Sequence, residues 1–271
     1  MVGWTSRTMR CRSSRTTLRP HFQTGCRRGA AVLELGVGDS IASGLVARAA
    51  GAGKVYLIDV ARFAKEDARF YKKLARDLAN RGLDVPDISK ATTINEVLKL
   101  CNAEYQTDGL ASLCSLPDQS VDMVWSQAVL EHIRKAQFEA TMAELRRIMR
   151  PGARASHVVD FKDHLTGALN NLRFSEALWE SSLFANSGFY TNRIQAPAML
   201  AVFERCGFGQ LDVRKEWRWN KLPTRRSAFD PMFRKIPEAD LLINCMKVTM
   251  QIPDTGVQVA NADGINAWAS P

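Results

Sequence analysis

The sequence lacks the features of an integral membrane protein and of a disulfide-bonded or zinc-binding one. Among its 271 residues, no apolar run approaches the roughly 18 residues that a membrane-spanning helix requires. The six cysteines form no CxxC pair, and none lies near a histidine at the spacing of zinc ligands. We therefore expect no membrane span and no metal site. Scattered thiols without a secretory signal also suit a reducing compartment, so we expect a cytoplasmic protein.

Acidic residues are absent from the first 33 positions, which hold seven arginines. The remainder of the chain has 30 basic against 28 acidic residues, so the net charge of +9 does not belong to a binding face of the fold. A nucleic-acid partner is therefore disfavoured. Residues 1–30 also lack the apolar segment of a secretory signal. Three interpretations of this leader stay open: a disordered basic segment, an organelle transit-like segment, or residues upstream of the true start.

From residue 31 onward, apolar strand patterns alternate with amphipathic helix patterns. The predicted strands are 31–35, 54–59, 103–107, 121–126, 155–161, 210–219 and 241–251. The predicted helices are 40–50, 65–80, 92–101, 135–150 and 197–206, with Phe70, Leu74 and Leu78 on the buried face of the second. The alternation predicts a Rossmann-like, doubly wound α/β fold. Its seven-stranded sheet would be mostly parallel, with an antiparallel last strand.

Two stretches depart from this alternation. Residues 162–195 contain no clean strand and hold five aromatic residues, so we expect a helical lid over the acceptor site at 162–200. Residues 252–271 follow the last predicted strand and are expected to form a flexible tail. The main domain is thus predicted to span residues 31–251.

The first strand leads into the turn Glu34-Leu35-Gly36-Val37-Gly38-Asp39-Ser40. Glycines here let the backbone turn sharply and approach a ligand closely. A dinucleotide fingerprint would need a third glycine where this chain has Ile41. The carboxylates of Glu34 and Asp39 also suit a cationic ligand better than a pyrophosphate. The turn therefore favours S-adenosylmethionine, which carries a sulfonium and an ammonium, over a phosphate cofactor.

Asp59 ends the second predicted strand, 21 residues after Gly38. At about this distance an acidic residue reaches the ribose of a nucleotide ligand in such folds. A carboxylate can accept hydrogen bonds from both ribose hydroxyls, although an Asp that only caps a helix is the alternative. Together with the glycine turn, Asp59 is predicted to bind ribose.

Four segments in order, VLELGVGDS, VYLIDV, LPDQSVDMVWSQAVLEHI and ELRRIMRPGA, resemble the class I S-adenosylmethionine-dependent methyltransferases. The resemblance covers roughly residues 31–161 and is nearest to the small-molecule, type 11-like group that includes quinone-biosynthesis enzymes. It implies that the turn Glu34–Ser40 holds the methionine part of the cofactor. It also implies that Asp59 and Val60 hold the ribose and the adenine edge.

The resemblance extends to two further places. Where the family often has an acidic adenine contact, this chain has Ser112 followed by Leu113, with Asp108 as the nearest acid. Ser126 and Gln127 end the fourth strand, where the family lines the methyl-donating side. The residues there lack the pattern of base-amine methyltransferases, in which Asn or Asp precedes two prolines and an aromatic.

Methyl transfer from a sulfonium is an in-line displacement, so alignment and exclusion of water supply much of its acceleration. A hydroxyl acceptor also needs a base, for which His132 is the candidate, since it follows the fourth strand closely. The alternative is that Glu131 and His132 only organise the start of a helix. Tyr190 and Arg193 in the lid are candidate contacts for the acceptor.

The sequence thus predicts S-adenosylmethionine-dependent methyl transfer to a small-molecule acceptor. Two alternatives stay open: a methyltransferase acting on RNA or protein, and a catalytically inactive cofactor-binding module of the same fold. Neither the acceptor nor the oligomeric state follows from the residues.

Overall fold

A seven-stranded sheet forms from the alternation that begins at residue 31. The computed structural model describes residues 27–254, and the strands lie in the order β3-β2-β1-β4-β5-β7-β6. Their bounds are β1 Ala31–Leu35, β2 Lys54–Ile58, β3 Ala103–Gln106, β4 Val121–Gln127, β5 Met149–Asp160, β6 Gly209–Arg218 and β7 Ile243–Gln251. Strands β1 to β5 pair in parallel, whereas β7 is antiparallel to both of its neighbours. This is the predicted doubly wound sheet.

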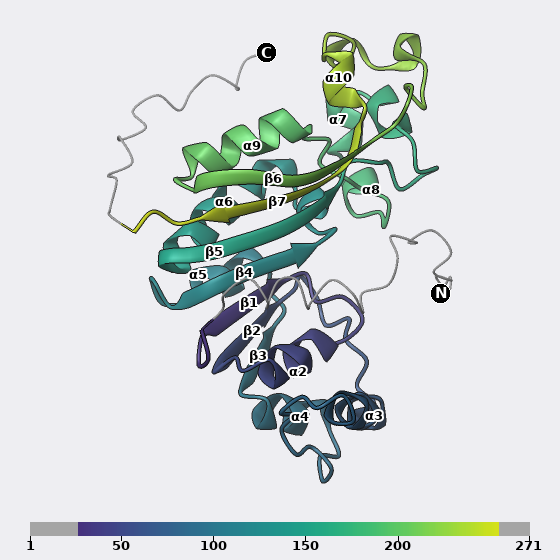
Figure 1. Cartoon of the computed structure of the whole chain (residues 1–271). Helices are drawn as coiled ribbons and strands as arrows, with labels where there is room; N and C mark the ends of the chain where they lie inside the picture. The colour runs from purple at the N-terminus through teal and green to yellow at the C-terminus, as the bar shows by residue number, and fades with distance from the viewer. Residues whose placement is uncertain (1–26, 255–271) are drawn as a thin grey trace.

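Helices cover both faces of the sheet (Figure 1). One face packs against α2 Ala42–Ala49, α3 Ala68–Ala79 and α4 Ile94–Leu100, and the other against α5 Leu110–Cys114, α6 Lys135–Ile148 and α9 Ala196–Arg205. Neighbouring strand residues alternate between the two cores, as Val32 and Leu33 do in β1. Both side chains are fully buried. Because the parallel strands are covered on both faces, their sequences are continuous apolar runs.

The buried face of α3 differs from the prediction. Phe70 is 42% exposed, whereas its neighbour Tyr71 is fully buried beside Ala75 and Leu78. The helix begins at Ala68, after the cap formed by Asp67, and this start sets the buried positions at 68, 71, 75 and 78. The Tyr71 hydroxyl donates to the carbonyl of Lys65 at 2.7 Å, so its polar end is satisfied inside the core. The prediction for Phe70 was wrong.

Strand β5 begins six residues before its predicted start. It includes Pro151 and Gly152, which lie between the predicted helix 135–150 and the predicted strand 155–161. The pairing register of β5 with β4 shifts between Val121 and Met123, and Gly152 has a φ of +75°. A glycine at this irregularity lets the strand continue through a conformation that other residues rarely adopt.

The segment between β5 and α9 contains three short helices, η2 Asn170–Arg173, α7 Glu176–Trp179 and α8 Ser182–Ala185. A further short helix, α10 Glu238–Leu241, lies directly before β7. Figure 1 shows β4 and β5 pointing toward the end of the sheet where α7, α8 and α10 gather. Two further short turns, η3 Arg226–Ala228 and η4 Pro231–Phe233, lie in the connection between β6 and β7. Leu169 and Leu172 of the lid pack with Phe229 and Phe233 of that connection. The sequence analysis did not predict this contact.

Two predicted regions fall largely outside the part of the chain that the structure describes. They are residues 1–26 of the leader 1–30 and residues 255–271 of the tail 252–271. Within residues 27–254, no helix combines the length and the apolar character needed to cross a bilayer.

The two adjacent aromatics of α3 allow a stability test. We expect Tyr71→Ala to lower the free energy of unfolding by about 3–5 kcal/mol, because it empties a fully buried site. Phe70→Ala should cost at most about 1.5 kcal/mol, the scale of the ring contact it removes. Urea unfolding measures both, and equal losses would contradict the assigned face.

Candidate functional site

The glycine turn lies at the carboxyl end of β1, where its backbone is held in a left-handed conformation. Gly36 has a φ of +76° and donates its N–H to the carbonyl of Ile58 at 2.8 Å. A Cβ placed on Gly36 would lie 2.2 Å from a methyl group of Val129. Gly38 has a φ of +68°, but a Cβ there would meet nothing within 4 Å. Gly36 is thus needed for packing, and Gly38 borders open space.

Asp59 joins the glycine turn to the end of β2. Its Oδ2 accepts from the Gly38 N–H at 2.8 Å, and its Oδ1 accepts from the Val60 N–H at 2.7 Å. Its own carbonyl accepts from the Gly109 N–H at 2.9 Å. The side chain is buried, with 7% exposed. The two residues that the sequence analysis linked by a spacing of 21 are therefore in direct contact.

Glu34 lies buried in β1, in register with Trp125 of β4. The hydroxyl of Ser43 donates to its carboxylate. Burial raises the pKa of Glu34 to about 7, which the hydrogen bond from Ser43 opposes only in part. A nearby positive charge would return this carboxyl to its ionised form.

The rest of the turn is more open. Asp39 is exposed, with Lys65 Nζ 3.8 Å away. Ser40 Oγ accepts from the Ala42 N–H at 3.1 Å, where α2 begins. The turn therefore presents carboxylates and backbone groups. Among the described residues, Lys65 is the cationic side chain that forms an ion pair with Asp39.

At the predicted adenine end, Val60 is 73% exposed, whereas Ser112 and Leu113 are both buried. Ser112 Oγ accepts from the Asp108 N–H at 3.0 Å, so this hydroxyl holds the start of α5. Leu113 is fully buried and belongs to the main core. The backbone N–H of Gly109 donates to the carbonyl of Asp59. A backbone contact of Ser112 or Leu113 with the adenine stays a prediction, because the burial of their side chains does not test it.

At the predicted methyl-donating side, Ser126 is buried and Gln127 is exposed at the last position of β4. Ser126 Oγ lies 2.7 Å from His157 Nδ1 of β5. Ala128 then has a φ of +53°, which turns the chain so that Val129 reaches Gly36. The end of β4 is therefore in contact with the glycine turn.

Comparison with known proteins decides the family. Residues 33–156 match the family model described as a methyltransferase domain, and they include the glycine turn, Asp59 and all of β4. The chain carries a class I S-adenosylmethionine-dependent methyltransferase domain. A search of curated proteins found no match to the sequence.

Three solved structures are similar to this chain. A SAM-dependent methyltransferase from Methanosarcina mazei is 17% identical, with a TM-score of 0.51 over 86% of this chain and 97% of that one. Phosphoethanolamine N-methyltransferase 2 of Haemonchus contortus, bound to phosphomonomethylethanolamine and S-adenosylhomocysteine, is 15% identical over 89% of this chain and 53% of that one, with a TM-score of 0.48. A putative methyltransferase of Haloferax volcanii, in complex with the Trm112 activator, is 15% identical over 89% and 90%, with a TM-score of 0.47.

Beyond β4, the methyltransferase chain forms the single turn η1 Leu130–His132. His132 Nδ1 lies 2.9 Å from the carbonyl of Tyr190, and burial lowers the pKa of His132. Its neighbour Glu131 is 2% exposed, and burial raises the pKa of that carboxyl to about 8. His164, from the loop after β5, packs its ring 4.7 Å from the ring of His132. His164 is a residue that the sequence analysis assigned no role.

The lid is fastened to η1 by Asn192. Its side-chain amide donates to the carbonyls of Leu130 at 2.8 Å and Ile133 at 3.0 Å, and its backbone N–H donates to the carbonyl of Glu131 at 2.7 Å. Asn192 is 1% exposed. The sequence analysis did not single it out, because an isolated Asn in a loop carries no recognisable pattern.

The predicted acceptor contacts Tyr190 and Arg193 are both buried within the lid. The Tyr190 hydroxyl donates to Glu180 at 3.0 Å and accepts from the Lys135 N–H at 3.2 Å. The Arg193 guanidinium binds the Glu176 carboxylate and donates to the carbonyl of Phe174 at 2.7 Å. These partners hold the lid together, and they do not support a direct role in acceptor binding.

The two glycines provide a test of the turn. A left-handed alanine costs about 1–2 kcal/mol of backbone strain, and Gly36→Ala adds the clash with Val129. Gly38→Ala meets open space and should incur the backbone cost alone. Urea unfolding should therefore show the larger loss of stability for Gly36→Ala, and equal losses would contradict this packing.

Proposed function

We propose that this methyltransferase transfers a methyl group to a small-molecule acceptor by in-line displacement. The main support is the lid, which Asn192 ties directly onto η1 at the methyl-donating side. A lid fastened in this way limits the space above the end of β4 and helps to exclude water, which favours compact acceptors. S-adenosylmethionine supplies the methyl group as a sulfonium.

The residues present fit this cofactor. Gly38 borders open space, and the carboxylates Glu34, Asp39 and Asp59 gather at the same edge of the sheet without a phosphate-binding pattern. We propose that Glu34 through Ser40 hold the methionine part and that Asp59 with Val60 holds the ribose and adenine edge. Gly109 adjoins this edge, since its N–H donates to the Asp59 carbonyl, and Ser112 and Leu113 stay proposals for a backbone contact with the adenine. Ser126 and Gln127 stay proposals for the methyl-donating side.

His132 is the side chain that we place beside the acceptor. Its Nδ1 faces the Tyr190 carbonyl, so Nδ1 carries the proton and Nε2 offers a lone pair. Nε2 can accept the proton of a hydroxyl acceptor, or it can bind a cation that holds the hydroxyl. These two roles exclude each other.

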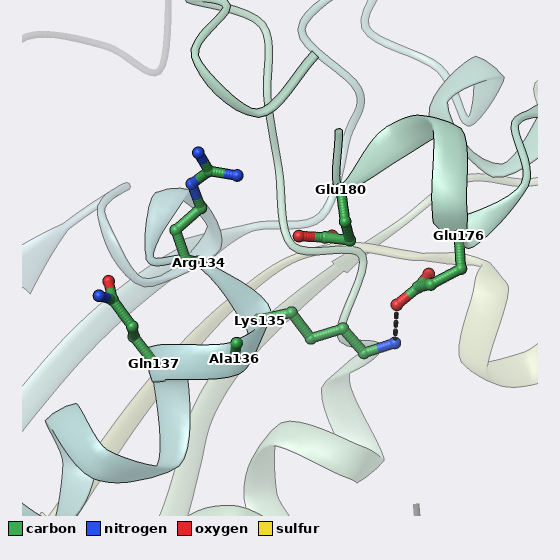
Figure 2. A pocket seen from close by; sticks show the side chains of 6 residues that line it. All are labelled: Arg134, Lys135, Ala136, Gln137, Glu176 and Glu180. Atoms are coloured by element: carbon green, nitrogen blue, oxygen red, sulfur yellow. Dashed lines mark hydrogen bonds and ion pairs between the residues drawn. The ribbon is translucent and has the colours of Figure 1, made fainter. Parts of the chain in front are cut away.

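A pocket of about 570 Å³ lies beside the lid, between the start of α6 and α7. Arg134, Lys135, Ala136, Gln137, Glu176 and Glu180 line it, and Figure 2 shows Lys135 reaching across to Glu176. It is a depression open to solvent, so it would hold only part of a ligand. Both signs of charge line this pocket, so we propose that a polar or zwitterionic part of an acceptor could extend into it.

A larger groove of about 1180 Å³ lies at the opposite end of the strands. Its basic side chains include Arg27, Arg150 and Arg214, which would suit an RNA acceptor. However, the groove borders the amino ends of β4 and the start of β5, whereas the glycine turn and η1 lie at the carboxyl ends. This separation favours the small-molecule proposal over RNA methylation.

We also propose a cytoplasmic location, based on the state of the cysteines. None of the four cysteines in residues 27–254 forms a disulfide bond. Thiols that stay reduced in this way are typical of a reducing compartment.

Asp59 can be tested through cofactor affinity. Asp59→Asn keeps the size of the side chain but replaces one acceptor oxygen with an N–H₂ group. The new side chain therefore cannot accept hydrogen bonds from both the Gly38 N–H and the Val60 N–H. We expect the affinity for S-adenosylmethionine to fall at least about tenfold, or ~1.4 kcal/mol. Asp67→Asn is the matched control, since Asp67 caps α3 in an exposed position. Calorimetry that gives equal affinities for both variants would contradict the ribose role.

Glu34 makes a separate prediction about protons. With a pKa of about 7, it is roughly half protonated at pH 7 in the free protein. A cationic cofactor lowers that pKa, so binding at pH 7 should release about half a proton, and binding at pH 9 should release none. Calorimetry in two buffers of different ionisation enthalpy measures the release, and Glu34→Gln should abolish it. Equal binding heats in both buffers for the unmodified chain would contradict the proposal.

A further inference from the structure

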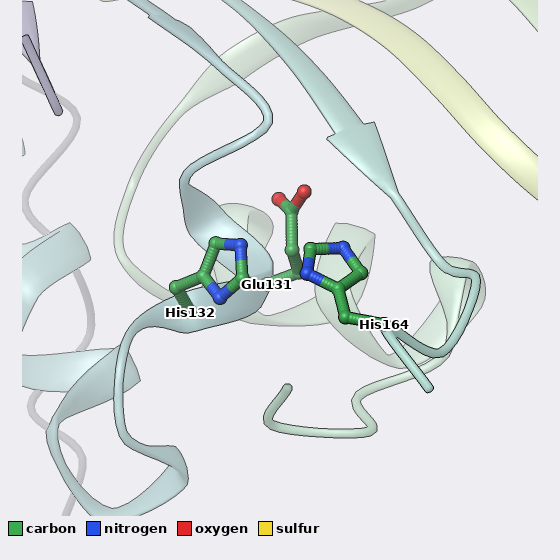
Figure 3. A group of neighbouring side chains, drawn as sticks. All are labelled: Glu131, His132 and His164. Atoms are coloured by element: carbon green, nitrogen blue, oxygen red, sulfur yellow. The ribbon is translucent and has the colours of Figure 1, made fainter. Parts of the chain in front are cut away.

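We propose that Glu131, His132 and His164 bind a divalent transition-metal ion at the methyl-donating side of the domain. One ligand atom from each of these side chains lies within 4.8 Å of the others. Figure 3 shows the cluster, with Glu131 and His132 on η1 and His164 on the loop beyond β5. These residues come from two separate segments, which the sheet brings together at the carboxyl ends of adjacent strands.

The first independent support comes from an unpartnered oxygen. Glu131 is 2% exposed, and its Oε1 accepts from the Asp160 N–H at 3.3 Å. Its Oε2 is buried and has no hydrogen-bond partner among residues 27–254. A buried carboxylate oxygen without a partner costs free energy, and a bound cation would offset that cost.

The second support is the orientation of His132. Metal-binding histidines usually donate their other ring N–H to a carbonyl or carboxylate, which fixes the ring and leaves one nitrogen for the metal. His132 has this arrangement, since its Nδ1 lies 2.9 Å from the Tyr190 carbonyl. Tyr190 is itself buried in the lid, so the carbonyl is held in place.

The third support is the loop that carries His164. The neighbouring residue Asp163 is 2% exposed and accepts from the backbone N–H groups of Leu165 at 3.0 Å, Thr166 at 2.6 Å and Gly167 at 3.1 Å. It also accepts from the backbone N–H of Asn170. A loop organised around one buried carboxylate holds His164 in a defined position.

The ligand set identifies the class of ion. Two imidazoles and one carboxylate suit Zn²⁺, Fe²⁺ and similar ions, whereas Mg²⁺ and Ca²⁺ prefer oxygen ligands alone. Three protein ligands leave coordination positions open, as in catalytic zinc sites. The role of the open positions rests on the proposed function: there the ion would hold an acceptor oxygen and promote loss of its proton. This role takes the place of His132 as the base.

The experiment is a calorimetric titration of the full chain, freed of metal by a chelator, with ZnCl₂ in the absence of cofactor and acceptor. We expect one Zn²⁺ per chain, and we expect His164→Gln and Glu131→Gln each to weaken binding at least tenfold. Glu66→Gln is the control matched to Glu131→Gln, because Glu66 is an exposed carboxylate that pairs with Arg62 and is not part of the cluster. It should leave binding unchanged.

Thermal melting and S-adenosylmethionine affinity of the same variants separate ligand loss from loss of fold. Both should match those of the unmodified chain for His164→Gln. CoCl₂ in place of ZnCl₂ should give visible absorption bands that His164→Gln removes. The proposal is overturned if the unmodified chain and His164→Gln bind Zn²⁺ alike, or if neither binds it. Because the titration contains no acceptor, a failure of methyl transfer would not affect its result.

Discussion

The contact between Asp59 and the glycine turn is the interaction on which the rest of the site depends. One carboxylate accepts hydrogen bonds from the backbone N–H groups of Gly38 and Val60, so it fixes the end of β1 against the end of β2. The same residue receives the Gly109 N–H through its carbonyl, which adds the segment after β3. The segments that follow three parallel strands, β1, β2 and β3, therefore all contact Asp59. This residue lies at the edge where open α/β sheets bind ligands.

A second constraint joins this edge to the acceptor side. Because Gly36 has no side chain, Val129 can pack against its backbone. Through this contact, the segment after β4 lies against the glycine turn. The turn η1 follows directly, so Glu131 and His132 are placed by the same contact. Asn192 then fastens the lid to η1 through three hydrogen bonds. The glycine turn, η1 and the lid thus form one continuous series of contacts.

Two acidic side chains with raised pKa values are buried near this series of contacts. Glu34 and Glu131 are both buried, and burial raises both pKa values, to about 7 and about 8. Neither carboxylate lies in an ion pair with a described cationic side chain at hydrogen-bond distance. Buried acids of this kind are more typical of functional sites than of structural cores, since an unpaired carboxylate destabilises a fold. Each therefore fits a cationic ligand: an organic cation at Glu34 and a metal ion at Glu131.

The sequence by itself determined the sheet and the placement of the glycine turn and Asp59 at the ends of their strands. Apolar strands alternate with helices over short distances, and the glycine turn and Asp59 follow their strands directly, so local pattern is enough to place them. Tertiary structure decided which face of α3 is buried, where β5 begins and how the lid meets the connection before β7. It also decided that His164 lies beside His132, 32 positions earlier in the chain, and that Ser112 and Leu113 turn inward. These features depend on packing between segments that are distant in sequence, for which local periodicity carries no signal.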